Sequence, residues 1–308
     1  MTAELAPGVP ACPAPWNCDG EGWIFPIYTP FSKTPIPLPK GCYSDFEKGT
    51  TFDQTERFHG GVGMVMIIRY NSTDVGPYDE MMYIPGLFSK EEAPKKYELA
   101  VTRIYVSSDA SVANGRANWG IPKHRADFSF TRVSSSPSKT LVTLSHPTTP
   151  ATPFFRAVLS NSKLTPFALP VSTSWLDWRL SRWLLSGYRA TLVQPPLSSS
   201  ADLAVLHPDK LETAENVTGQ NPDTLTGTAG KTLAISPSAT GWSRLACIEV
   251  APPPVEGVGG AGAEEDWSGF GDGKSFPTFE VAKEGPIAGR GVHLPSFEMV
   301  FPEAVEVK

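Results

Sequence analysis

Residues 115–124 read GRANWGIPKH and place one lysine, Lys123, directly after an apolar turn that contains Gly120 and Pro122. Burial in such a turn disfavours the ammonium form of a lysine and so favours the free amine. A free amine can attack a carbonyl carbon and form a Schiff base. The stretch therefore makes Lys123 the first candidate for a catalytic residue. The alternative is a surface lysine beside a proline-induced bend.

The segments on both sides of this stretch resemble, in their order, the acetoacetate decarboxylase-like superfamily. GPYDE at residues 76–80 comes first, a β-rich run over residues 97–106 follows, and then come Gly115-Arg116 and the proline-lysine pair that ends at Lys123. In that superfamily a glycine-arginine pair precedes a proline-lysine-lysine motif, and a carboxylate lies upstream in a glycine-aromatic-glutamate segment. The resemblance implies that Lys123 is the Schiff-base lysine and Glu80 the active-site carboxylate.

The resemblance spans roughly residues 15–305, and later segments extend it. PFFR at residues 153–156 and FGDGKSFP at residues 270–277 are similar to the fungal and plant-type members of the superfamily. The resemblance implies a mainly β (α+β) fold: an antiparallel β-barrel or cone with an internal cavity and few helices.

Two departures from the decarboxylase pattern bear on the substrate. His124 stands where the motif has its second lysine, and its charge at pH 7 is small at an ordinary histidine pKa. The place of a second glutamate falls in the apolar run 64–66, and no arginine precedes Arg57 to bind a substrate carboxylate. These changes favour a larger and less acidic carbonyl compound than acetoacetate.

The hydrophobic pattern predicts short strands, because the apolar runs are β-branched or aromatic and are broken by 31 prolines and 27 glycines. The expected strands cover residues 63–70, 81–84, 97–106, 127–133, 140–145, 154–159, 189–193, 245–250 and 296–301. One helix is expected over residues 175–185, with Ser174 as its N-cap. Residues 1–308 are expected to form a single domain with a surface elaboration around residues 196–230.

Composition excludes several classes of function. A formal net charge of −6 gives no basic surface for nucleic acid, and no apolar run reaches 18 residues, so we expect neither a nucleic-acid partner nor a membrane span. The four cysteines are scattered and the five histidines show no metal-binding spacing, so we expect reduced thiols and neither a metal nor another cofactor. A soluble cytoplasmic protein is expected, and the sequence is compatible with a homo-oligomer.

We interpret the chain as a lyase or cyclase that binds a carbonyl-containing small molecule, such as a secondary metabolite, through a Schiff base on Lys123. Decarboxylation, aldol or retro-aldol cleavage, dehydration and cyclisation remain open. The alternatives are a cavity protein or cyclase that binds an apolar small molecule without lysine chemistry, and a homologue without activity. The expected catalytic residues are Lys123, Glu80 and His124, and the expected substrate-binding residues are Arg116, Trp119, Val65, Phe128, Phe130 and Tyr78.

Overall fold

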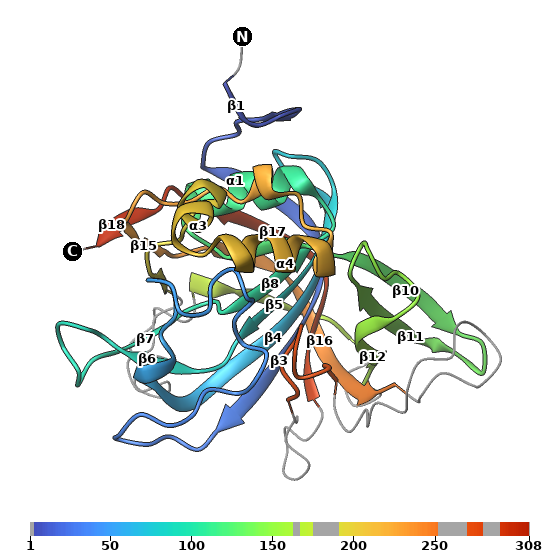
Figure 1. Ribbon diagram of the computed structural model, residues 1–308. Coiled ribbons are helices and arrows are strands. Elements are labelled where there is room, and N and C mark those ends of the chain that lie inside the picture. The colour runs from blue at the N-terminus through green and yellow to red at the C-terminus, as the bar shows by residue number, and fades with distance from the viewer. Residues whose placement is uncertain (1–2, 163–166, 175–190, 252–269, 280–289, 308) are drawn as a thin grey trace.

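The computed structural model describes residues 3–162, 167–174, 191–251, 270–279 and 290–307 (Figure 1). These residues form a 16-stranded sheet, a separate two-stranded sheet of β1 and β2, and three α-helices. The mainly β class with few helices, predicted from the sequence, is therefore confirmed. No helix among these residues is long and apolar enough to cross a membrane.

The element bounds are as follows. The strands are β1 (Glu4–Ala6), β2 (Val9–Pro10), β3 (Trp16–Thr29), β4 (Phe58–Ser72), β5 (Tyr78–Ile84), β6 (Leu87–Ser89), β7 (Tyr97–Leu99), β8 (Arg103–Val106), β9 (Lys123–Arg125), β10 (Asp127–Val133), β11 (Ser136–Ser145), β12 (Pro153–Asn161), β13 (Leu169–Ser172), β14 (Leu192–Gln194), β15 (Thr232–Ile235), β16 (Ser238–Val250), β17 (Arg290–Phe301) and β18 (Val305–Val307). The helices are α1 (Asp109–Trp119), α3 (Ser200–Leu206) and α4 (Pro208–Thr218).

The main sheet follows the pairing order β10-β11-β12-β16-β17-β3-β4-β6-β7-β14-β15-β18. A branch adds β5 beside β4, then β8 beside β5 and β9 beside β8. Within the described ranges the two end strands, β10 and β18, do not pair with each other, so the predicted closure into a barrel or cone is not confirmed. Figure 1 shows β3, β4, β5 and β8 side by side, with α1, α3 and α4 gathered across one end of them and β10, β11 and β12 projecting to one side.

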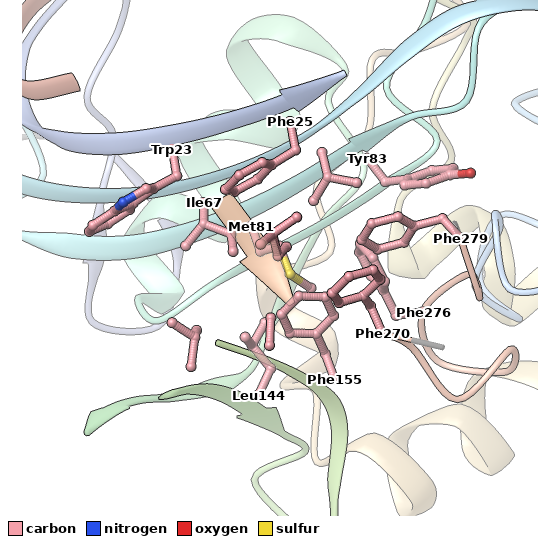
Figure 2. Packing of buried hydrophobic residues seen from close by; sticks show 14 of the residues in the cluster. Trp23, Phe25, Ile67, Met81, Tyr83, Leu144, Phe155, Phe270, Phe276 and Phe279 are labelled. Carbon is pink, nitrogen blue, oxygen red and sulfur yellow. The ribbon is translucent and has the colours of Figure 1, made fainter. Parts of the chain in front are cut away.

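Both faces of the central strands are buried. On β4 and β5, Val65 and Met81 belong to one apolar cluster, which also contains the aromatic residues drawn in Figure 2. Tyr70 and Met82, whose side chains point the other way along the same two strands, belong to a second cluster beneath α1. Burial on both faces explains why the sequence of β4 shows a nearly continuous apolar run instead of strict alternation.

Helix α1 was not predicted, because residues 115–124 were interpreted as a turn. The Ser108 side chain caps its first turn by accepting from the Ser111 backbone N–H. Gly120 ends the helix in the left-handed conformation at φ 64°, with its N–H bonded to the Arg116 carbonyl oxygen. Only residues 120–122 therefore form the turn, and Gly115 lies inside the helix.

Most of the predicted strands are present, and the differences lie at their ends and in two longer segments. The segment 97–106 divides into β7 and β8. The long strand β3 and the short strands β1, β2, β6, β9, β13, β15 and β18 were not predicted. The region 196–230 is more than a surface connection, because α3 and α4 pack there and Leu203 and Leu225 form an apolar cluster with Phe46. The helix predicted over residues 175–185 lies outside the described residues, as does part of the strand predicted over 189–193.

Candidate active site

The Lys123 side chain is buried between β9, β5 and α1. It is 3% exposed, and its Nζ atom lies 2.9 Å from Oε2 of Glu80 on β5. Nζ also donates to Oγ of Ser111 on α1 at 3.0 Å and to the hydroxyl of Tyr78 at 3.3 Å. Three oxygen acceptors thus surround an amine that has almost no contact with solvent.

Glu80, which is 1% exposed, has a second partner besides the lysine. The Tyr70 hydroxyl donates to its Oε1 atom at 3.2 Å. Burial, followed by the negative charge of Glu80, raises the pKa of both Tyr70 and Tyr78 well above the ordinary value. Both hydroxyl groups therefore remain protonated near neutral pH and can act as hydrogen-bond donors.

Gly115 leaves the space through which the Lys123 side chain runs. A Cβ atom at position 115 would lie 2.6 Å from Cδ and 2.7 Å from Cε of Lys123, closer than real Cβ contacts allow. Gly115 and Ser111 lie one turn apart on the same face of α1. Gly115 contacts the carbon chain of Lys123, and Ser111 accepts a hydrogen bond from the amine of Lys123. The spacing between Gly115-Arg116 and Pro122-Lys123 in the sequence thus brings Gly115 on α1 into contact with Lys123 on β9.

His124 lies on the opposite face of β9 from Lys123. Its Nε2 atom is 2.8 Å from Oε2 of Glu47, and its ring stacks on Phe46 with the centroids 5.2 Å apart. Because successive side chains of a strand point in opposite directions, adjacent residues cannot both face the Glu80 carboxylate. His124, which was expected to be catalytic, therefore does not contact Lys123 or Glu80 in this structure.

Arg116 also binds Glu47 and is completely buried. Its Nη1 atom lies 3.0 Å from Oε1 of Glu47, and its other nitrogens donate to the carbonyl oxygens of Thr226 and Ser198 at 3.0 Å. Its Nη1 atom also donates to the carbonyl oxygen of Lys123 at 3.4 Å, so Arg116, which was expected to bind substrate, has its hydrogen bonds directed at groups of the protein. Glu47 thus joins α1 to β9 through two charged or polar partners.

The charges of this second cluster follow from its contacts. Burial opposes ionisation of Glu47, but His124, Arg116 and the Ser44 hydroxyl outweigh it and lower the pKa of Glu47 to about 2. Burial lowers the pKa of His124 below its ordinary value, although Glu47 acts in the opposite direction. Near neutral pH, Glu47 is therefore an anion paired with Arg116, and His124 is a neutral donor.

The remaining residues expected to bind substrate are divided between the two apolar clusters. Tyr78 contacts the lysine, as described above. Trp119 packs edge-on against Trp16 and donates to the carbonyl oxygen of Pro302 at 2.8 Å. Val65, Phe128 and Phe130 lie with the cluster of Figure 2, on the other face of the sheet from Glu80.

Four residues of the two polar clusters were not predicted: Ser111, Tyr70, Glu47 and Ser44. Tyr70 could have been found, because it pairs with Tyr78 across the hairpin that joins β4 to β5. Ser111 becomes recognisable only once α1 is known. Glu47 lies in a loop far from Arg116 and His124 in sequence, so no local pattern indicates it.

Among the residues that the structure describes, no group of three or more histidine, cysteine or acidic side chains is arranged to hold a metal ion. The chemistry available at Lys123 is that of a buried amine, a carboxylate and three hydroxyl groups.

Residues 55–152 match the sequence model of the acetoacetate decarboxylase (ADC) family. The matched segment carries Glu80 and Lys123 together with Tyr70, Tyr78 and Ser111, whereas Glu47 precedes it. The chain matches no curated protein sequence.

Three solved structures are similar to the chain at low sequence identity. Acetoacetate decarboxylase from Legionella pneumophila subsp. pneumophila str. Philadelphia 1 is 12% identical over 97% of this chain and 88% of its own, with a TM-score of 0.49. A second acetoacetate decarboxylase is 11% identical over 97% of this chain and 92% of its own, also with a TM-score of 0.49. The enduracididine biosynthesis enzyme MppR complexed with pyruvate is 10% identical over 96% and 91% of the two chains, with a TM-score of 0.46.

Proposed function

We propose that the chain is a lyase or cyclase that forms a Schiff base between Lys123 and a carbonyl-containing small molecule, such as a secondary metabolite. The observation that carries the proposal is the buried contact of 2.9 Å between Nζ of Lys123 and Oε2 of Glu80. A buried amine beside a carboxylate can lose its proton to that carboxylate and then act as a nucleophile. The match of residues 55–152 to the acetoacetate decarboxylase family supports the same chemistry.

The reaction begins when Glu80 takes a proton from the ammonium group of Lys123. The free amine adds to the carbonyl carbon, and the carbinolamine then loses water, which needs a proton at its oxygen. Glu80 or the Tyr78 hydroxyl, which is hydrogen-bonded to Nζ at 3.3 Å, can supply it. The resulting iminium accepts the electron pair released when an adjacent carbon–carbon or carbon–hydrogen bond breaks, which gives an enamine. A proton taken up at carbon restores an iminium, and water hydrolyses it to release the product and the amine.

Acetoacetate itself is a poor candidate for the substrate. Its carboxylate needs a cation, yet three arginines that could take this role are already bound to other groups. Arg103 donates to the carbonyl oxygens of Gly41, Tyr43 and Lys274, Arg116 pairs with Glu47, and Arg125 contacts Asp109 and Asp127. A carboxylate left unpaired in a dry site costs several kcal/mol, so we expect negligible decarboxylation of acetoacetate.

The alternative is a protein that binds a small molecule without covalent chemistry. The three hydrogen bonds of the Lys123 amine also favour this non-covalent function, because they can hold the amine as a charged partner of Glu80 with a purely structural role. The two functions differ in one observable: only a Schiff base makes the exchange of the ligand's carbonyl oxygen with water depend on the amine of Lys123 and exceed the rate of spontaneous hydration.

The experiment is oxygen exchange of a simple ketone in water enriched in oxygen-18. Forming and hydrolysing an imine replaces the ketone oxygen with one from water, so the wild-type protein should accelerate the exchange of acetone above the uncatalysed rate. Lys123→Arg, which keeps a positive charge but cannot form a neutral amine, should abolish the acceleration. Lys139→Arg, at an exposed ion pair with Glu249, is the matched control and should leave it unchanged.

Exchange that persists in Lys123→Arg would eliminate the Schiff-base mechanism. No acceleration in the wild type, with acetone or with larger ketones, would favour the non-covalent function.

A further inference from the structure

Tyr70 reaches the carboxylate of the candidate active site from the neighbouring strand. Tyr70 on β4 is the direct cross-strand partner of Tyr78 on β5, and Glu80 follows Tyr78 by two residues on the same face of the sheet. Diagonal neighbours of this kind lie about 7–8 Å apart, a distance that an aromatic side chain can span. The hydroxyl of Tyr70 therefore meets Oε1 of Glu80 at 3.2 Å.

The Tyr70 side chain is held in this position. It is 3% exposed, and its ring centroid lies 4.7 Å from that of Tyr78 and 6.0 Å from that of Phe297. Among the residues that the structure describes, Glu80 is the hydrogen-bond partner of its hydroxyl. Because the pKa of Tyr70 is raised well above its ordinary value, first by burial and then by Glu80, the hydroxyl keeps its proton and remains a donor.

The two oxygen atoms of Glu80 thus have different partners. Oε2 accepts a hydrogen bond from Nζ of Lys123 at 2.9 Å, and Oε1 accepts one from Tyr70. Rotation of the carboxylate about its bond to the side chain would exchange the two oxygens, and the donor at Oε1 opposes this rotation. A hydrogen bond to a carboxylate also favours its charged form over its protonated form.

We propose that Tyr70 is a positioning residue of the Lys123 site: it holds Oε1 of Glu80 and leaves Oε2 as the atom that takes the proton of Lys123 and returns it. In that step the proton moves from Nζ to Oε2, while Tyr70 keeps its own. The inference rests on the proposed function, because only a reactive amine needs such a transfer. It goes further by assigning the transfer to one oxygen atom and by naming the residue that limits how tightly this atom keeps the proton.

The experiment compares Tyr70→Phe with the wild type over a range of pH. Labelling of Lys123 by acetaldehyde and cyanoborohydride is quantified by peptide mass spectrometry from about pH 4 to about pH 8. The rate of the variant is divided by that of the wild type at each pH, which removes the effect of pH on the reagents. On the acid side the labelling falls as Glu80 takes up a proton from solvent and can no longer accept one from the lysine.

We expect the ratio of the two rates to rise by about tenfold from the acid end to the neutral end of this range. A hydrogen bond to a charged group favours the charge by an amount equivalent to about one to two pH units, so the carboxylate without Tyr70 is protonated at a higher pH. The acid limb of the variant therefore moves upward by on the order of one pH unit. A tyrosine that only fills space would change the rate by the same factor at every pH.

Two further variants locate the effect. Tyr83→Phe removes a hydroxyl from an equally buried tyrosine of β5 that belongs to the other apolar cluster, and it should leave the acid limb unmoved. A Glu80→Gln background has no carboxylate at this position, so Tyr70→Phe should there change the rate by the same factor at every pH.

The outcomes separate this role of Tyr70 from the proposed function. An acid limb that stays in place in Tyr70→Phe, or that moves equally in Tyr83→Phe, would overturn the role of Tyr70 and leave the Schiff base intact. A pH-dependent effect that persists in the Glu80→Gln background would do the same, because Tyr70 would then act through another group. Absence of the adduct on Lys123 in the wild type at every pH would reject the Schiff base, and the role of Tyr70 with it.

Discussion

The two faces of β9 carry two buried ionic clusters with different partners. On one face, Lys123 binds Glu80 and two hydroxyl groups. On the other, His124 and Arg116 share Glu47. Both carboxylates are at most 2% exposed, so burial does not distinguish them.

The difference lies in what each cation can do. A guanidinium ion keeps its proton under all ordinary conditions, so Arg116 holds Glu47 as a permanent ion pair. A lysine can transfer its proton to a neighbouring carboxylate and become a nucleophile. The Arg116 face is therefore suited to fixing α1 against β9, and the Lys123 face to chemistry.

The largest expected effect is on stability, at the Arg116 face. Glu47→Ala leaves a buried guanidinium without its anion, which typically costs 3–5 kcal/mol, on the order of a third of the stability of a domain. Chemical denaturation monitored by circular dichroism measures the loss. Glu249→Ala, which breaks an exposed pair with Lys139, is the control and should cost about 1 kcal/mol or less. A loss of only about 1 kcal/mol for Glu47→Ala would mean that the ion pair between Glu47 and Arg116 contributes little to the stability of the fold.

Lowering the pH should reduce the free energy of unfolding because of a second buried histidine, His146. Burial, with the nearby Arg103 charge, lowers the pKa of His146 to about 4. Above pH 6.5 this histidine is neutral in both the folded and the unfolded chain. Between pH 6.5 and about 4 only the unfolded chain takes up the proton, so the stability falls as the pH falls, by roughly 3 kcal/mol at most.

The free energy of unfolding measured from pH 7 to pH 4.5 tests this, because Glu47 titrates below that range. His146→Gln removes the titrating group and should make the curve flatter, while the contribution of His124, whose pKa is also lowered, remains. An identical slope in the variant would show that His146 is not held neutral by the fold.

On the Lys123 face, Glu80→Gln should affect the chemistry more than the fold. The variant keeps the size of the side chain but removes the group that takes and returns the proton, so reductive labelling of Lys123 by acetaldehyde should slow by about 100-fold. The stability should fall less than in Glu47→Gln, because a lysine without its anion can become neutral and an arginine cannot. Equal losses of stability in the two variants would remove the distinction between the faces.

The smallest effect is expected at the contact between α1 and the lysine. Gly115→Ala gains helix propensity, about 1 kcal/mol, but its Cβ would displace Cδ and Cε of Lys123. We expect stability within about 1 kcal/mol of the wild type and labelling of Lys123 reduced by roughly tenfold. Ala117→Gly in the same helix is the control for propensity. Wild-type labelling in Gly115→Ala would show that the position of the amine tolerates this shift.

The comparison also shows what the sequence could predict. The runs that became β4, β5 and β10 were recognisable because their hydrophobic patterns are long and local. Lys123, Glu80 and Tyr78, which the structure brings into contact, were selected as candidates through the order of short motifs. His124 was predicted as a catalytic residue on the condition that it faces the cavity of Lys123. Its ring lies instead on the Glu47 side of β9, because neighbouring residues of a strand point to opposite faces.

Other features depend on contacts between distant segments. Glu47 meets Arg116 only because a loop folds across α1 and β9, and no spacing in the sequence encodes that contact. The capping signals of α1, Ser108 and Gly120, were present in the sequence, but the helix has no apolar stripe that would have drawn attention to it. Its glycine and polar residues are buried because they contact Lys123 and the segment around Thr226.

The central claim is that the buried Lys123, and not an exposed lysine, is the reactive amine of the chain. The most direct measurement is reduction of the wild-type protein with borohydride in the presence of a limiting amount of acetone, followed by quantification of the isopropyl adduct on every lysine peptide. The account predicts that the adduct concentrates on Lys123, although that side chain is only 3% exposed. Labelling that follows solvent exposure, with Lys123 among the least modified lysines, would contradict it.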